Sequence, residues 1–118
     1  MNQELAGQML QLSRTGLEGL EHICELNEKG DYETGVKLFS DEVWAVSEIE
    51  KALAVDDSDL DFQLKDAQDE LTLVFATVAD AYEDKAYQQL TGLMDNSLVP
   101  LYKKWQEGLQ TALQPYLN

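Results

Sequence analysis

The chain has 118 residues, of which 44% are apolar, and its formal net charge at pH 7 is −15. This length and apolar content are typical of one folded domain and argue against a disordered chain. The negative charge argues against binding to nucleic-acid phosphates or to an anionic membrane surface. Only 7 Gly and 2 Pro are present, and the residues that favour helices dominate, so we expect an all-α protein.

The first amphipathic segment covers residues 3–28. Its apolar residues recur at steps of three and four, which predicts a helix with one buried face. Gly16 and Gly19 lower the helix propensity by about 1 kcal/mol each relative to Ala, and we expect a neighbouring helix to approach closely there. Gly30 then supplies a stop signal, and Asp31 is a candidate N-cap for the next helix.

Two further helices follow. The second covers residues 32–54 and leads into an acidic stretch, residues 55–61, that is rich in turn and cap residues. The third covers residues 60–83 and has apolar residues at heptad spacing. The apolar pattern changes phase after this segment, so we expect a break with Asp84 as the N-cap of the last helix.

The four segments have similar lengths, which predicts an antiparallel up-down bundle of four helices in a single domain over residues 1–118. One alternative is a single helix over residues 60–114. Its second half would extend beyond its partners, and its apolar face would then need a second chain, as in an interlocked dimer.

The stretch NSLVPLYKKW, residues 96–105, places Pro100 inside the last segment. A proline in a helix interior removes a backbone hydrogen bond and bends the helix, whereas in the first turn it is tolerated. The apolar phase continues across the proline through Leu93, Ser97, Leu101 and Trp105. This continuity favours a helix that is kinked at Pro100 over a helix boundary.

No catalytic signature is present, and we expect neither enzymatic activity nor a bound cofactor or metal. His22 is the only histidine, so the paired Glu-x-x-His motifs of carboxylate-bridged metal sites are absent. The acidic stretch fails as an EF-hand because Phe62 and Gln68 stand where glycine and glutamate are required, which leaves a helix-capping turn. Cys24 has no activating neighbour in the sequence and is interpreted as a structural thiol.

A cytoplasmic location is expected from three observations. Cys24 is the only cysteine, which suits a reducing compartment. The N-terminus lacks the features of a secretion signal. The most apolar stretch, residues 71–81, is too short to span a bilayer.

The charges divide unevenly along the chain. Residues 1–83 hold 20 acids and 5 bases, whereas residues 84–118 hold 3 acids and 3 bases. Because this neutral segment is also aromatic, we expect it to bind a protein partner, with a helical segment of that partner laid in a groove. The alternative is that Trp105 belongs to the core. The candidate contact residues are Leu98, Leu101, Tyr102, Trp105 and Leu109.

Two segments carry a resemblance to known proteins, DYETGVKLFSDEVWAVSEIEKAL (residues 31–53) and EDKAYQQLTGLMDNSLVPLYKKWQEGLQ (residues 83–110). The second contains an acid at the start of the last helix, a short Leu-rich helix, and then Asp95, Pro100 and Trp105. The chain resembles a group of small helical bacterial proteins of uncharacterised function and, more distantly, the FliT-type chaperones of flagellar export. The resemblance implies a helical adaptor whose C-terminal helix helps to control partner binding.

We therefore expect a non-enzymatic protein-binding module, a chaperone-like adaptor of flagellar export or secretion. One alternative is an acidic protein that binds basic partners electrostatically through residues 1–83, in which case salt would weaken the binding steeply. A metal-dependent helical-bundle protein is a third alternative, and formation of a homodimer is left open.

Overall fold

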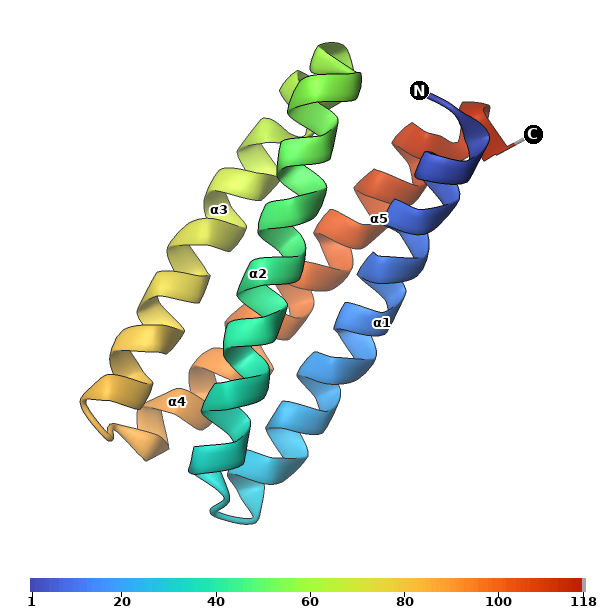
Figure 1. The fold of residues 1–118 in the computed structure, drawn as a ribbon. Helices are drawn as coiled ribbons and strands as arrows, with labels where there is room; N and C mark the ends of the chain where they lie inside the picture. The colour runs from blue at the N-terminus through green and yellow to red at the C-terminus, as the bar shows by residue number, and fades with distance from the viewer. Residues whose placement is uncertain (118) are drawn as a thin grey trace.

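The computed structural model describes residues 1–117, which form helices joined by short turns (Figure 1). The elements run up and down in a rod that measures 43 × 21 × 20 Å. The predicted all-α up-down bundle is confirmed. In chain order the elements are α1 (Gln3–Glu28), α2 (Tyr32–Asp56), α3 (Ser58–Glu83), the short α4 (Tyr87–Leu93), the π turn η1 (Met94–Leu98) and α5 (Val99–Leu117).

The first two connections follow the predicted cap residues. The carboxylates of Asp31 and Asp57 accept hydrogen bonds from the backbone N–H groups of Thr34 and Leu60. Each bond satisfies an N–H group in the first turn that has no partner within its helix. Gly30 has a φ of +82°, a left-handed conformation that glycine adopts without strain.

The break between α3 and the last helical segment is confirmed, but its caps differ from the prediction. Asp84 is the C-cap of α3, and its backbone N–H bonds to the carbonyl of Asp80, so it is not the N-cap of the next helix. Lys85 has a φ of +55° and takes the left-handed place that glycine usually fills after a helix. Because the chain reverses there, a single helix over residues 60–114 is wrong.

The last helical segment contains a π turn before its proline. In η1 the backbone N–H of Val99 bonds to the carbonyl of Met94, five residues earlier. Pro100 is the second residue of α5, which continues directly from η1, so its missing N–H interrupts the hydrogen-bond ladder next to the π turn. Figure 1 shows α4 and α5 as successive parts of one bent helical segment. The bend is therefore located at the π turn, next to the predicted kink.

The π turn also changes which residues face the core. A turn of this kind contains more residues than an α-helical turn, so buried positions recur at steps of four through Leu90, Met94, Leu98 and Tyr102. The predicted phase through Leu93, Ser97 and Leu101 is one residue out for this reason.

The helices form a closed ring around the core, in which α1 and α3 each pack against both α2 and α5. Gly16 of α1 leaves room for a side chain of α5. A Cβ atom at Gly16 would overlap the hydroxyl of Tyr102, which donates a 2.8 Å hydrogen bond to the carbonyl of Ser13. The space at Gly16 and Gly19 is thus occupied by the ends of long side chains, Tyr102 and Glu42, and not by the backbone of a neighbouring helix as expected.

Two glycine substitutions in α1 are expected to have opposite effects. Gly7→Ala should raise the free energy of unfolding by about 0.5–1 kcal/mol, because its Cβ would meet no atom within 4 Å and alanine favours the helix. Gly16→Ala should lower it by about 1–3 kcal/mol, because its Cβ would displace the Tyr102 hydroxyl. Urea denaturation measures both values, and stabilisation by both variants would contradict the packing described here.

Candidate functional site

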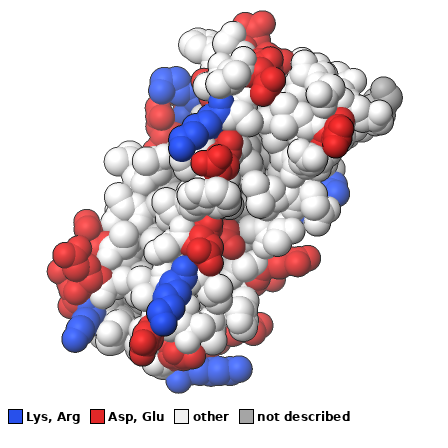
Figure 2. Space-filling model, viewed as in Figure 1, with Lys and Arg blue, Asp and Glu red and all other residues white. Residues whose placement is uncertain are grey.

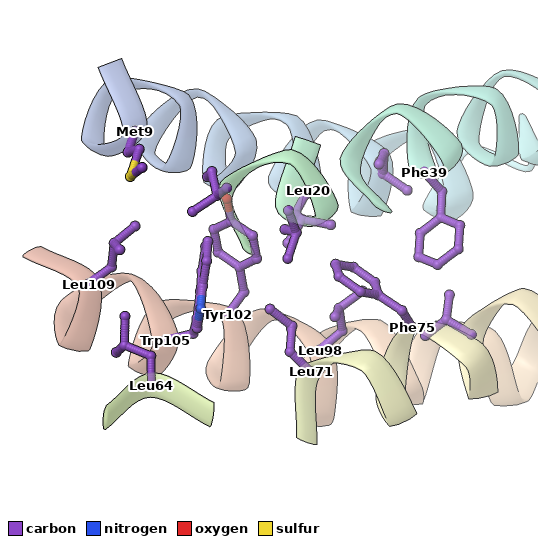
Figure 3. Packing of buried hydrophobic residues seen from close by; sticks show 14 of the residues in the cluster. Met9, Leu20, Phe39, Leu64, Leu71, Phe75, Leu98, Tyr102, Trp105 and Leu109 are labelled. Atoms are coloured by element: carbon purple, nitrogen blue, oxygen red, sulfur yellow. The ribbon is translucent and has the colours of Figure 1, made fainter. Parts of the chain in front are cut away.

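The residues predicted to contact a partner do not form an exposed face. Leu98, Trp105 and Leu109 are 0% exposed and Tyr102 is 1% exposed, whereas Leu101 is partly exposed. Figure 3 shows the four buried side chains pointing from the last helical segment into the space between the other helices. The prediction that these residues form a surface is therefore wrong. The neutral, aromatic face of this segment closes the bundle and is part of the core.

A buried carboxyl group lies beside Tyr102. Glu42 of α2 is 9% exposed, and its carboxylate occupies the space that Gly16 and Gly19 leave on α1. Its Oε2 atom has no hydrogen-bond partner among the described residues. Burial, together with the charge of Asp41, raises the pKa of Glu42 to about 7. The interface between α1 and α2 therefore contains a group that binds a proton near neutral pH.

The histidine and the cysteine lie apart from this carboxyl group. His22 is exposed, and its Nδ1 atom lies 3.8 Å from Oε2 of Glu25 on the same helix. Burial, followed by the nearby carboxylate of Asp95, raises the pKa of the Cys24 thiol to about 12, so the thiol is protonated at neutral pH. Within residues 1–117, no group of three His, Cys, Asp or Glu side chains is placed to hold a metal ion.

The acidic turn after α2 acts as a helix cap, as predicted. Asp57 accepts a 2.6 Å hydrogen bond from the hydroxyl of Tyr116 and a second one from the backbone N–H of Leu60. Both bonds hold the pKa of Asp57 below its usual value. The bond from Tyr116 also connects this turn to the C-terminal end of α5.

An apolar groove runs between α2 and α3, which lie side by side in Figure 1. Two adjoining cavities of about 780 and 370 Å³ form it, and they share Phe39, Val43 and Ala79 as lining residues. We refer to it as the α2–α3 groove. It is lined by Tyr32, Glu33, Val36, Phe39, Ser40, Val43, Val46, Ser47 and Glu50 of α2, by Thr72, Phe75, Ala76, Ala79, Tyr82 and Glu83 of α3, and by Lys85 and Tyr87.

The sizes of the side chains explain why the groove exists. On its inner side, the ring of Phe39 packs against the rings of Phe75 and Tyr82, with centroids 5.7 and 5.6 Å apart. These rings separate the two helices near the core. The outer side carries small residues that do not fill the resulting gap. These small residues are Ser40, Ser47, Ala76 and Ala79.

Tyrosines form one end of the groove. The rings of Tyr32 and Tyr87 stack with their centroids 3.7 Å apart and their planes 3° apart. The hydroxyl of Tyr82 donates a 2.9 Å hydrogen bond to Oδ1 of Asn27 in α1, and Gly35 leaves room for this bond. These contacts hold the groove wall against α1 and α4, so this end is formed before any partner binds.

Two large apolar side chains lie on the outer faces of the two helices that form the groove, although neither lines it. Trp44 is 64% exposed and Leu73 is 69% exposed. By helical spacing, Trp44 lies one turn from Ser40 and Ser47, and Leu73 lies one turn from Ala76. Figure 2 shows uncharged atoms in a continuous area over α3 and the adjoining edge of α2, with charged side chains above and below it. The uncharged surface therefore extends beyond the groove, and it includes the exposed side chains of Trp44 and Leu73.

A hollow of about 740 Å³ between α3 and α5 has a different chemistry. Its lining includes Gln63, Lys104, Glu107 and Thr111, which interrupt the apolar surface. The α2–α3 groove is therefore the better candidate site for an apolar partner.

None of the groove residues is among the contact residues predicted from the sequence. One signal for the groove is nevertheless present in the sequence. Trp44 and Leu73 lie outside the apolar seams of their helices, at positions where a solvated helix carries polar residues. Large apolar residues on both the core face and an outer face of a helix indicate that the outer face also binds another element or molecule.

The fold and the groove together define an all-α bundle with an exposed apolar face. Residues 4–108 match the family described as Domain of unknown function (DUF8042), and the chain belongs to this family. No curated protein and no solved structure matches the chain. The likeness to FliT-type chaperones stays a prediction. None of the helices within residues 1–117 has the length and apolarity needed to cross a membrane.

The two tryptophans provide a matched test of the corrected site. Trp105→Ala should lower the free energy of unfolding by about 3–5 kcal/mol, because it removes a fully buried indole from the core. Trp44→Ala should change it by less than about 0.5 kcal/mol. Chemical denaturation followed by far-UV circular dichroism measures both, and equal effects would contradict the assignment of Trp105 to the core.

Glu42 is expected to make stability depend on pH. Its pKa is raised from 4.5 to about 7 in the folded protein, so between these values the folded state binds more protons than the unfolded state. Its contribution to stability is therefore present at low pH and is lost as pH rises through about 7. The wild-type protein should therefore lose free energy of unfolding as pH rises from about 5 to 8. Glu42→Gln has no group that ionises at this position, so its loss over the same range should be smaller by about 1–3 kcal/mol. Parallel slopes in urea titrations across this range would contradict the raised pKa.

Proposed function

We propose that this protein is a non-enzymatic protein-binding module whose α2–α3 groove receives the apolar face of a helical segment from another protein. The observation that carries the proposal is the groove itself, an apolar channel on the outside of the bundle that no other element of residues 1–117 covers. A groove between two helices is a common receptor for an amphipathic helix, which fills it with side chains one turn apart.

The dimensions of the groove suit such a segment. On α2 its lining runs from Tyr32 to Glu50, a length of about 27 Å at 1.5 Å per residue, which matches about five turns of a bound helix. The small side chains on the outer side leave room for a third helix to lie between α2 and α3. Trp44 and Leu73 would then contact the flanks of the bound helix, where large apolar side chains contribute most to binding.

The predicted role as a chaperone-like adaptor of flagellar export or secretion is compatible with this geometry. Such an adaptor shields an apolar helical segment of its client, and a groove on a stable bundle can do so without chemistry. The proposed binding site lies between α2 and α3, whereas the sequence placed it on the last helix. The lone Cys24 supports a cytoplasmic setting for this function.

A purely electrostatic binder of basic proteins is the second candidate, and the uneven charge distribution favours it. Residues 1–83, with 20 acids and 5 bases, contribute α1, α2 and α3. Binding of this kind would require charge but no groove, so it would disappear with salt and would not respond to a neutral change inside the groove.

A neutral peptide and a pair of alanine substitutions test the proposed function. The peptide has about 18 residues, the length of the groove, with Leu and Ala on one helical face and Gln on the other. Ala79→Lys places a long side chain in the part of the groove that both cavities share, and it should weaken peptide binding at least about tenfold, or about 1.4 kcal/mol. Calorimetric titration of the peptide into each protein measures the affinity.

Ala54→Lys is the matched control for this experiment. Ala54 is an exposed residue of α2 that lines neither cavity, and the substitution changes the net charge by the same amount. It should leave the affinity within about twofold of the wild-type value. The proposed function is wrong if the peptide does not bind, or if the two variants bind it equally well.

A further inference from the structure

The α2–α3 groove carries an unsatisfied negative charge at the end away from the tyrosines. Glu50 lines this end, and its Oε1 atom is buried without a hydrogen-bond partner among the described residues. Burial raises the pKa of Glu50, and the charges of Asp61 and Asp69 on α3 raise it further. Lys65 acts in the opposite direction, but its Nζ atom is 3.4 Å from Oδ2 of Asp69 and is already engaged.

A positive charge supplied by a ligand would stabilise the carboxylate of Glu50. A half-buried carboxylate with an oxygen that lacks a partner is costly, and three carboxylates near one ammonium group leave an excess of negative charge. A donor that enters along the groove would reach Glu50 after passing an apolar lining. The complementary ligand is therefore apolar along its length and cationic at one end.

The overall charge favours the same ligand. A net charge of −15 attracts a basic partner and speeds its association. A second copy of this chain in the groove would bring another −15 to the interface, and its repulsion would oppose the apolar contact.

We propose that the α2–α3 groove binds a cationic amphipathic helix of another protein, in which a Lys or Arg side chain pairs with Glu50 while the apolar face fills the groove. This inference rests on the proposed function and names the class of partner. Arg is the better fit of the two, because its planar guanidinium can donate two parallel hydrogen bonds to one carboxylate.

The test compares three peptides that share the apolar face of the neutral peptide above. They carry Arg, Gln or Glu in both terminal turns, so that either orientation places one of these residues beside Glu50. The Arg peptide should bind about tenfold tighter than the Gln peptide, and the Glu peptide should bind more weakly than both. The advantage of Arg over Gln should shrink as NaCl is raised from about 0.05 to 0.5 M.

Substitution of the carboxylate completes a double-mutant cycle. Glu50→Gln should remove most of the advantage of the Arg peptide and leave the affinity of the Gln peptide within about twofold. Glu18→Gln, at an exposed position on α1, makes the same change in net charge and should leave the advantage of Arg intact. Far-UV circular dichroism is the control for folding, and both variants should give the same helical spectrum as the wild-type protein.

The outcomes separate this inference from the proposed function. If all three peptides bind equally well, or if Glu18→Gln reduces the advantage of Arg as much as Glu50→Gln does, the pairing with Glu50 is wrong while the groove remains a binding site. If none of the peptides binds, both proposals fail. If the wild-type protein is a dimer in sedimentation experiments and Ala79→Lys makes it monomeric, the occupant is a second copy and the cationic helix is wrong.

Discussion

The hydrogen bond from the Tyr102 hydroxyl to the Ser13 carbonyl, made across the bare backbone of Gly16, determines how α5 closes the bundle. It requires a glycine on one helix and a phenol on the other. It also requires that Tyr102 face inward, which depends on the π turn between Met94 and Leu98. With a regular α-helix through this segment, a different set of residues would face α1. The ring of Tyr102 also packs edge-on against that of Trp105, with centroids 5.3 Å apart, so the same face of α5 carries both buried aromatic residues.

The two sides of the bundle are built on different packing principles. On the side of α1, glycines allow close approach, and large polar or aromatic side chains such as Glu42 and Tyr102 fill the space that they leave. Between α2 and α3, the rings of Phe39 and Phe75 separate the helices, and small outer residues leave the gap open. The closed side supplies stability, and the open side supplies a surface on which a helix can lie. Binding in the groove therefore need not disturb the core.

Two carboxylates on α2 illustrate the same division. Glu42 faces α1, and Glu50 lies two turns further along the same helix and faces the groove. Each has an oxygen without a hydrogen-bond partner among the described residues. A partner laid along the groove can reach Glu50 but not Glu42. The first carboxylate is thus part of the folded core, and the second is part of the proposed binding surface.

Much of the fold could be predicted because its signals are local. Apolar residues spaced three and four apart can be buried on only one helical face, and Gly30, Asp31 and Asp57 act on their own immediate neighbours. The break after α3 was also detectable as a change of phase. Its caps were not, because Lys85 adopts a left-handed conformation that its residue type does not indicate.

The sequence by itself determined the all-α class and the positions of the first two helices, since these depend on periodicity and local caps, but it left open whether residues 60–114 form one helix or two. Only the tertiary structure decided the phase of the last helix, because Leu93, Ser97 and Leu101 form as plausible an inner stripe as Met94, Leu98 and Tyr102. It also decided that the face of α5 that carries Trp105 is enclosed by the other helices, whereas the outer position of Trp44 was already indicated by its place outside the apolar seam of α2. The burial of a side chain depends on which residues surround it in space, and a single sequence shows only which residues precede and follow it in the chain.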